Sequence, residues 1–226
     1  MLKKWEDLPK EMQLPEVREY YDILCKKKAH LLLKRIFDVV VSFILLTLLS
    51  PVFIILAIAI KLDSKGPVFY RQVRVTKYGK IFRIFKFRSM VTDADKGSLL
   101  TVGGDSRITK TGRFIRKYKL DELSQLIDVF RGTMTFVGTR PEVPKYVEKY
   151  TPEMMATLLL PAGITSEASI YYKDENELLD AAQDVEKTYL EVVLPDKMKY
   201  NLAAIRSFSF IDDIKVMILT VLAVFK

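Results

Sequence analysis

An uncharged apolar run from Val39 to Ile60 restricts this chain more than any other feature. As a straight helix the run would be about 33 Å long, enough to cross the hydrocarbon core of a bilayer. A cleaved signal peptide fits poorly, because a long charged segment precedes the run and the run is longer than the apolar part of such peptides. The run therefore predicts a helix that enters a membrane.

Both flanks of the apolar run are basic, and the run contains a break. Pro51 lies near its middle, lacks a backbone N–H and crowds the carbonyl of Thr47, while Ser50 can bond back to the preceding turn. The positive-inside rule would place both flanks in the cytoplasm, so the chain would turn back at Ser50 and Pro51. The residues alone leave two models open, a re-entrant helix and a kinked spanning helix. The flanking cations are Lys26, Lys27, Lys28, Lys34 and Arg35 before the run, and Lys61, Lys65, Arg71 and Arg74 after it.

Composition narrows the chemistry of any site. The net charge of +8 over 226 residues favours an anionic partner, which could be nucleic acid, lipid headgroups or phosphorylated substrates. Cys25 is the only cysteine and His30 the only histidine of the sequence. An intrachain disulfide and a cysteine zinc cluster are thus excluded, and a Ser/His/Asp triad is disfavoured. An enzyme built from this chain has to rely on carboxylates, Arg and Lys.

The pattern predicts an α+β fold that is predominantly helical. We expect a helical cytoplasmic or interfacial lead-in over residues 1–29, a membrane helix over 30–62 and one cytoplasmic domain over 63–226. Aromatic and β-branched residues alternate with Arg and Lys over 68–90, which predicts a basic β-hairpin that turns at 77–80. Its cations could face solvent, lipid headgroups or substrate.

Two further apolar stripes have helical spacing. One runs from Leu120 to Phe130, ends at Gly132 and predicts a half-buried helix with Asp121 and Glu122 in its first turn. The other runs from Ile211 to Phe225 and predicts an amphipathic helix, which could lie on a membrane interface or pack against the domain. Alone, Asp121 and Glu122 would be explained as residues that complement a helix dipole.

Several ordered phrases together resemble the monotopic phosphoglycosyl transferases, a family of bacterial sugar transferases. The resemblance extends from Lys34 almost to the end of the chain. The phrases are KRIFD from Lys34, the Ser50 Pro51 break, GPVFYRQVR from Gly66, KFRSM from Lys86, DSRITKTGRFIRKYKLDELSQL from Asp105, and DVFRGTMTFVGTRPE from Asp128.

The resemblance implies a function and a set of residue roles. Such enzymes transfer a sugar 1-phosphate from a UDP-sugar to polyprenyl (undecaprenyl) phosphate, release UMP and begin polysaccharide or glycoconjugate assembly. It implies that Asp121 is a catalytic nucleophile that forms a covalent phosphosugar intermediate, and that Glu122 is catalytic and binds Mg²⁺. Arg116 and Arg140 would bind substrate phosphates, as would Lys86, a weaker candidate.

The resemblance also implies a location. It favours the re-entrant form of the membrane helix, in contact with lipids of the bacterial inner membrane, with the catalytic domain on the cytoplasmic face. The oligomeric state stays open, a homodimer included. The sequence departs from the family pattern at Ser124 and Thr139, where Pro is common, and in PAGITSEAS from Pro161. The identity of the donor sugar is therefore not predicted.

Two other classes of protein explain fewer of the sequence features than a sugar transferase does. A non-enzymatic scaffold on the membrane surface, binding anionic lipid through the hairpin and the C-terminal helix, would explain the charge and the apolar run. It gives no reason for the phrases around Asp121 and Arg140 to occur together. A nucleic-acid-binding protein would suit the pI of about 9.3, but the membrane helix argues against it, so we expect no nucleic-acid partner.

Overall fold

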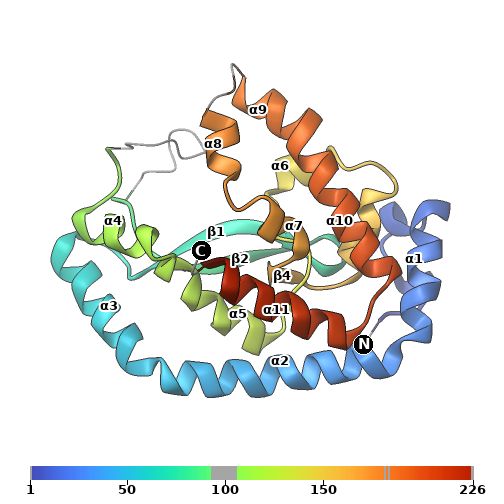
Figure 1. The fold of residues 1–226 in the computed structure, drawn as a ribbon, viewed down its shortest axis with the longest axis horizontal. Coiled ribbons are helices and arrows are strands. Elements are labelled where there is room, and N and C mark those ends of the chain that lie inside the picture. The colour runs from blue at the N-terminus through green and yellow to red at the C-terminus, as the bar shows by residue number, and fades with distance from the viewer. Residues whose placement is uncertain (1, 93–105, 181, 183, 225–226) are drawn as a thin grey trace.

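The computed structural model describes residues 2–92, 106–180, 182 and 184–224, and most of them are helical. Figure 1 shows two helices, α2 and α3, along one edge, with the hairpin and the remaining helices on one side of α2. Asp105, the first residue of the longest family-like phrase, lies outside the described residues. The α-helices are α1 (Pro15–Lys26), α2 (Lys28–Leu48), α3 (Ser50–Asp63), α4 (Lys110–Lys117), α5 (Leu126–Arg131), α6 (Pro144–Val147), α7 (Glu167–Tyr171), α8 (Glu175–Asp180), α9 (Val185–Thr188), α10 (Leu194–Arg206) and α11 (Phe210–Val224).

Short helical turns and two small sheets complete the fold. The strands β1 (Phe69–Thr76) and β2 (Lys80–Phe87) pair antiparallel, and β3 (Met134–Val137) and β4 (Ala162–Thr165) pair parallel. The 3-10 helices are η1 (Trp5–Asp7), η2 (Lys10–Met12), η3 (Lys77–Gly79), η5 (Leu120–Gln125) and η6 (Met154–Leu159), and η7 (Tyr189–Val193) is a π-helix. The mostly helical α+β fold with a basic hairpin is confirmed.

The predicted break in the apolar run is present between α2 and α3. Pro51 has no N–H to give to the carbonyl of Thr47, and the hydroxyl of Ser50 donates to that carbonyl instead at 2.8 Å. The two helices bend by 61° at this point. In the described part of the chain no single helix is long and apolar enough to cross a membrane, whereas this bent pair together has the required length and composition. The bend fits a re-entrant loop and also a broken span.

The hairpin turn places β1 beside β2 in a fixed register. Thr76 pairs with Lys80, and the residues between them form η3. Tyr78 and Gly79 have positive φ angles of 61° and 69°. This left-handed backbone closes the short loop, and glycine adopts it without strain. The alternation seen in the sequence thus corresponds to two strands of equal length.

The lead-in is helical, as expected, and it packs into the body of the protein. Tyr20 and Leu24 of α1 are fully buried, in a core shared with residues of η6 and α10. The Tyr20 hydroxyl donates to Glu153 at 2.5 Å, and the backbone N–H of Lys3 donates to the Tyr78 hydroxyl at 2.8 Å. The lead-in therefore also holds the turn of the hairpin.

Three charged residues in the first half of α2 attach this helix to the domain. The ammonium of Lys34 donates to Asp213 of α11 at 2.6 Å and to the carbonyl of Val137 at 2.7 Å. Arg35 donates to the carbonyls of Val129 and Phe130 at the end of α5, at 2.8 and 3.0 Å. Asp38 accepts from the Thr135 hydroxyl and the Phe136 N–H of β3, at 2.7 and 3.2 Å. We call Lys34, Arg35 and Asp38 the α2 clasp.

A carboxylate pair among cations

The apolar stripe around Asp121 forms two short helical elements, whereas the sequence predicted a single helix. Instead of one helix, a 3-10 turn, η5, carries Asp121 and Glu122 and leads into α5. Lys119 just before η5 has a positive φ of 52°. This left-handed residue ends the continuity with α4, so the carboxylates start a new turn. Gly132, with φ of 83°, ends α5 where the sequence predicted.

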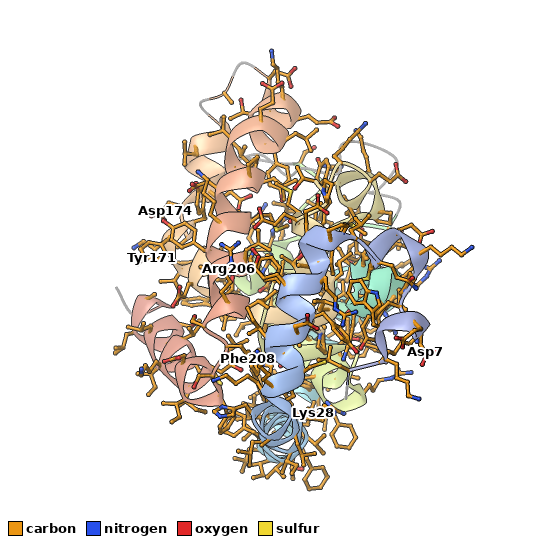
Figure 2. All side chains as sticks on the ribbon, turned by 90° about the vertical axis from the view of Figure 1, so that its right-hand side faces the viewer. Asp7, Lys28, Tyr171, Asp174, Arg206 and Phe208 are labelled. Atoms are coloured by element: carbon orange, nitrogen blue, oxygen red, sulfur yellow. The ribbon has the colours of Figure 1, made fainter. Side chains whose placement is uncertain are left out.

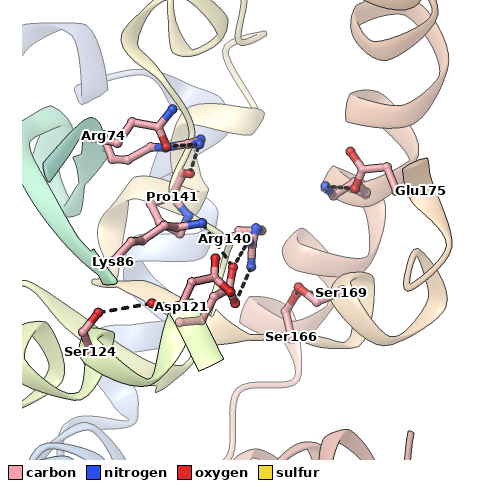
Figure 3. A network of polar contacts seen from close by, with 12 residues as sticks. Arg74, Lys86, Asp121, Ser124, Arg140, Pro141, Ser166, Ser169 and Glu175 are labelled. Carbon is pink, nitrogen blue, oxygen red and sulfur yellow. Dashed lines mark hydrogen bonds and ion pairs between the residues drawn. The ribbon is translucent and has the colours of Figure 1, made fainter. Parts of the chain in front are cut away.

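Glu122 is held by two cations from distant parts of the chain. Its Oε1 accepts from Arg140 Nη2 at 2.5 Å and from Lys86 Nζ at 3.3 Å, and Arg140 Nη1 lies 3.4 Å from Oε2. Figure 3 shows Lys86 of β2, the carboxylates of η5 and Arg140 meeting in one network. The structure thus brings together four of the predicted site residues, Lys86, Asp121, Glu122 and Arg140.

The ion pairs set the protonation of Glu122. Burial alone would raise the pKa of this carboxyl, but the charges of Arg140 and Lys86 outweigh burial and hold the pKa well below its usual range. Burial lowers the pKa of Lys86, although Glu122 opposes the shift. Glu122 raises the pKa of Arg140. Glu122 is therefore held as a carboxylate by the charges of Arg140 and Lys86.

Asp121 is in a different electrostatic position. Burial raises the pKa of its carboxyl above the usual range, the neighbouring Glu122 adds to the shift, and Lys86 and Arg116 oppose it. The hydroxyl of Ser124 donates to the backbone carbonyl of Asp121 at 3.2 Å and not to its carboxylate. A desolvated carboxylate close to cations has the character of a nucleophile or of a ligand for a positive group.

Arg116 adds positive charge near Asp121. It lies in the last turn of α4, and its Nη1 is buried without a hydrogen-bond partner among the described residues. An unsatisfied buried guanidinium nitrogen is costly and fits a site whose anionic partner is a ligand. Arg116 lowers the pKa of Asp121 through its charge, so it belongs to the same electrostatic cluster.

Arg74, which was predicted only as a basic flank of the apolar run and a cation of the hairpin, contacts the residue that follows Arg140. Its Nη1 donates to the carbonyl of Pro141 at 3.0 Å, and its Nε and Nη2 bind Gln72 Oε1 at 3.1 and 2.7 Å. Figure 3 shows Arg74 and Pro141 at the edge of the network. Arg74 fixes the loop that carries Arg140. Its place in GPVFYRQVR was the available signal, but the alternating pattern left open whether the hairpin cations face solvent, lipid headgroups or substrate.

The fold and the site together define a class of protein. Two adjacent carboxylates lie among Lys86, Arg116 and Arg140, in a domain attached to a bent pair of apolar helices. Guanidinium groups suit phosphate oxygens, so the class that these features favour is a protein that acts on phosphate-bearing ligands.

Comparison with known proteins gives the family. The model of the bacterial sugar transferase family matches residues 29–226, and the chain belongs to this family. It is 36% identical over 197 residues to a UDP-glucose:undecaprenyl-phosphate glucose-1-phosphate transferase of Klebsiella pneumoniae, covering 85% of this chain and 40% of that protein. It is 36% identical to a putative undecaprenyl-phosphate N-acetylgalactosaminyl 1-phosphate transferase of Bacillus subtilis, covering 67% of this chain and 85% of that protein.

A third relative is a UDP-N-acetylgalactosamine-undecaprenyl-phosphate N-acetylgalactosaminephosphotransferase of Aeromonas hydrophila, 32% identical over 84% of this chain and 43% of that protein. The chain thus spans about two fifths of the length of the Klebsiella and Aeromonas relatives. Residues before Ala29 lie outside the family match, although α1 shares a core with matched residues.

Proposed function

We propose that this protein transfers a sugar 1-phosphate from a UDP-sugar to polyprenyl phosphate, giving a polyprenyl-diphosphate sugar and UMP. The observation that carries the proposal is the pairing of a desolvated Asp121 with the Glu122, Arg140 and Lys86 cluster. The names of the relatives describe this type of reaction on undecaprenyl phosphate. The sugar remains open, because those relatives are named for different sugars.

Asp121 is the nucleophile of the proposed reaction. A carboxylate oxygen of Asp121 attacks the sugar-proximal phosphorus of the donor, and the bond from this phosphorus to the bridging oxygen breaks. The electron pair leaves with UMP, and the protein keeps an acyl phosphate that carries the sugar. A phosphate oxygen of the polyprenyl phosphate then attacks the same phosphorus and expels the Asp121 carboxylate. The second pKa of a phosphate monoester is about 6, so the acceptor needs no strong general base at neutral pH.

The cations make this attack feasible. A carboxylate approaching a diphosphate meets like charge, and positioned cations offset the repulsion and stabilise the transferring oxygens. Arg116 supplies a buried Nη1 that has no hydrogen-bond partner in the part of the chain that the structure describes. Arg140, with a side chain that is 39% exposed, reaches solvent while bound to Glu122. The charge of Lys86 acts on both carboxylates and lowers the pKa of each.

Magnesium fits the residues present. The described residues contain no group of three or more His, Cys, Asp or Glu side chains that could hold a metal by themselves. Mg²⁺ is commonly held by one or two carboxylates together with substrate phosphates, and Glu122, with Asp121 beside it, supplies such carboxylates. Glu122 would hold the ion, which would neutralise charge on the donor diphosphate. Arg140 and Lys86 keep Glu122 ionised for this role.

We further propose that α2 and α3 enter the cytoplasmic leaflet of the bacterial inner membrane and return to the same side. Large apolar side chains on these helices are about half exposed or more, among them Phe43 at 59%, Leu48 at 68% and Ile55 at 65%. Figure 2 views α2 nearly end-on beneath the domain. Cysteines placed at Glu6 and Lys65 in a Cys25→Ser protein should both be labelled only from the cytoplasm. Periplasmic labelling of one site would instead indicate a spanning helix.

The proposed reaction is tested by incubating the protein with UDP-sugars and without acceptor, and by measuring UMP together with the masses of the intact protein and of its proteolytic peptides. We expect UMP release equal to the amount of enzyme and a mass gain of one phosphosugar on the Asp121 peptide. Asp121→Asn, which is nearly isosteric, should lose both signals. Asp7→Asn, an exposed acid outside the family match, should keep both. Normal turnover by Asp121→Asn, or UMP release only after acceptor is added, would rule out the covalent route.

A further inference from the structure

A cavity of about 200 Å³ lies between the end of β3, α10 and α11, apart from the carboxylate cluster. Part of its wall is buried and apolar. Ile205 and Phe208 are each 4% exposed and Val216 is 6% exposed, and all three line the cavity. Figure 2 labels Phe208 where the chain passes from α10 to α11. The mechanism proposed above gives this cavity no role.

The residues that line the cavity extend from the loop that carries Arg140 to the exposed apolar face of α11. Thr139, which precedes the Glu122-bound Arg140, lines the cavity on one side. Leu219 of α11 also lines it and is 51% exposed. Leu219 continues into an exposed apolar face on α11 that includes Ile218 and Leu222, at 56% and 54% exposed. An apolar chain at this face could therefore enter the cavity and end near Arg140.

Size and charge restrict the occupant. Pockets for whole small-molecule ligands usually measure about 300–1,000 Å³, so this cavity is too small for a nucleotide sugar and suits a short apolar segment. Its charged lining is mainly acidic, with Glu167, Asp212, Asp213 and one cation, Lys215. Lys215 is already paired with Asp212 at 2.7 Å. Asp213 is likewise paired, with Lys34 at 2.6 Å. The described lining therefore offers a phosphate group no free cation, and its positive partner would be Arg140, the residue after Thr139.

We propose that this cavity binds the first isoprene units of the polyprenyl phosphate acceptor, with the phosphate directed toward Arg140. The proposal rests on the function proposed above and adds the place where the lipid substrate is bound. The tail would continue from the cavity along the exposed face of α11 into the membrane. The buried wall of Ile205, Phe208 and Val216 would contact the isoprene carbons, and burial of this apolar surface would contribute to acceptor affinity.

Two neighbouring alanines of α10 offer a matched test. Ala204 lines the cavity and Ala203 does not, and both are exposed. We expect Ala204→Phe to fill the cavity and raise the KM for polyprenyl phosphate at least 10-fold, with the KM for the UDP-sugar changed less than 2-fold. Ala203→Phe should leave both constants unchanged. An unchanged acceptor KM in Ala204→Phe, or equal shifts for both substrates, would overturn the assignment.

Photolabelling of the wild-type protein removes any dependence on variant folding. A geranylgeranyl phosphate with a diazirine on its first isoprene unit should label peptides from 204–219, and excess unlabelled polyprenyl phosphate should abolish the label. Labelling elsewhere, or equal labelling by a phospholipid with the same group, would overturn the proposal. If wild-type protein releases no UMP from any UDP-sugar, the proposed function fails, whereas normal UMP release with misplaced label refutes only the cavity assignment.

Discussion

The ion pair between Lys34 and Asp213 provides a quantitative test of how α2 is attached to the domain. The two side chains are 7% and 14% exposed, and the Nζ to Oδ2 distance is 2.6 Å. Removing one partner of a buried pair typically costs about 3–5 kcal/mol, because the other charge stays buried. Asp213 can escape part of this cost by taking up a proton, since burial already raises its pKa despite the charge of Lys34. We therefore expect Lys34→Met to lower the free energy of unfolding by about 3 kcal/mol at pH 7.

A double-mutant cycle separates the interaction energy of the Lys34–Asp213 pair from the other effects of each substitution. Lys34→Met also removes the donor to the Val137 carbonyl, a loss that Asp213→Asn does not share. The double variant Lys34→Met/Asp213→Asn leaves no buried charge at the pair, so its cost should fall short of the sum of the single costs by about 2 kcal/mol. The loss in Lys34→Met should shrink as the pH falls toward 5, because Asp213 then becomes protonated in the folded variant.

Urea unfolding in detergent, followed by the fluorescence of Trp5, gives the required free energies. Trp5 is the only tryptophan of the sequence and packs against Tyr21 in the lead-in, away from the substituted pair. Lys215→Met/Asp212→Asn, which removes an exposed pair of α11, is the matched control and should cost less than about 1 kcal/mol. Additive single costs, or a loss below 1 kcal/mol in Lys34→Met, would refute the reasoning.

Three other outcomes are expected. Gly163→Ala should destabilise the protein by about 3 kcal/mol and reduce UMP release, because its Cβ would lie 2.2 Å from the backbone nitrogen of Gly138. Thermal unfolding measures the loss of stability, and the UMP assay measures the loss of activity. Lys86→Met should move the acid limb of the pH–rate profile to higher pH, because Lys86 lowers the pKa of Asp121 and the ionised form is the nucleophile. Excess chelator should abolish UMP release, and Glu122→Gln should lower kcat by about 100-fold and raise the Mg²⁺ concentration needed.

Two of these outcomes have a matched control variant. At Gly79 no atom of the described residues, apart from its two chain neighbours, lies within 4 Å of the Cβ that alanine would add. Gly79→Ala therefore has only the strain of its φ of 69° and should cost about 1 kcal/mol. Lys80→Met, on the exposed end of β2, should leave the acid limb in place. An unmoved limb in Lys86→Met, wild-type activity in Glu122→Gln, or equal destabilisation by the two glycine variants would each contradict the corresponding argument.

Local patterns in the sequence predicted the elements that depend on neighbouring residues. Alternation gave the hairpin, and helical spacing gave α11. The missing donor of Pro51 together with the Ser50 hydroxyl predicted the break, and the 61° bend is there. No element was predicted between Gly132 and Ile211, where the structure has β3, β4, the 13-residue helix α10 and several helical turns of four to six residues. The short elements have too few residues for a periodic signal. The apolar stripe of α10 is weakened because Lys197 and Asn201 are among its buried residues.

The site was predictable as a set of residues only through the family-like phrases. Lys86 and Glu122 are 36 positions apart, and Arg140 lies another 18 positions beyond Glu122. No spacing rule connects such positions, so from residue type alone Asp121 and Glu122 looked like acids at a helix start. The tertiary contacts, which raise the pKa of one and lower that of the other, are what distinguish them. The break in helix geometry at Lys119 was equally invisible, because lysine carries no local preference for a positive φ.

The α2 clasp gives the family-like phrase KRIFD a physical meaning. Arg35 holds the end of α5 through the Val129 carbonyl, and α5 follows directly from the turn that carries Asp121 and Glu122. Asp38 holds β3 through Thr135 and Phe136, and β3 leads directly to Arg140.

The turn that carries Asp121 and Glu122 and the loop that carries Arg140 are therefore both attached to one segment of α2. If α2 lies in the membrane as proposed, these hydrogen bonds fix the distance of Asp121 and Arg140 from the bilayer surface. An acceptor phosphate is held near that surface by its polyprenyl tail, so a fixed height is what its reaction with Asp121 would require. Substitution of Arg35 or Asp38 should then impair turnover with the lipid acceptor more than the donor half-reaction.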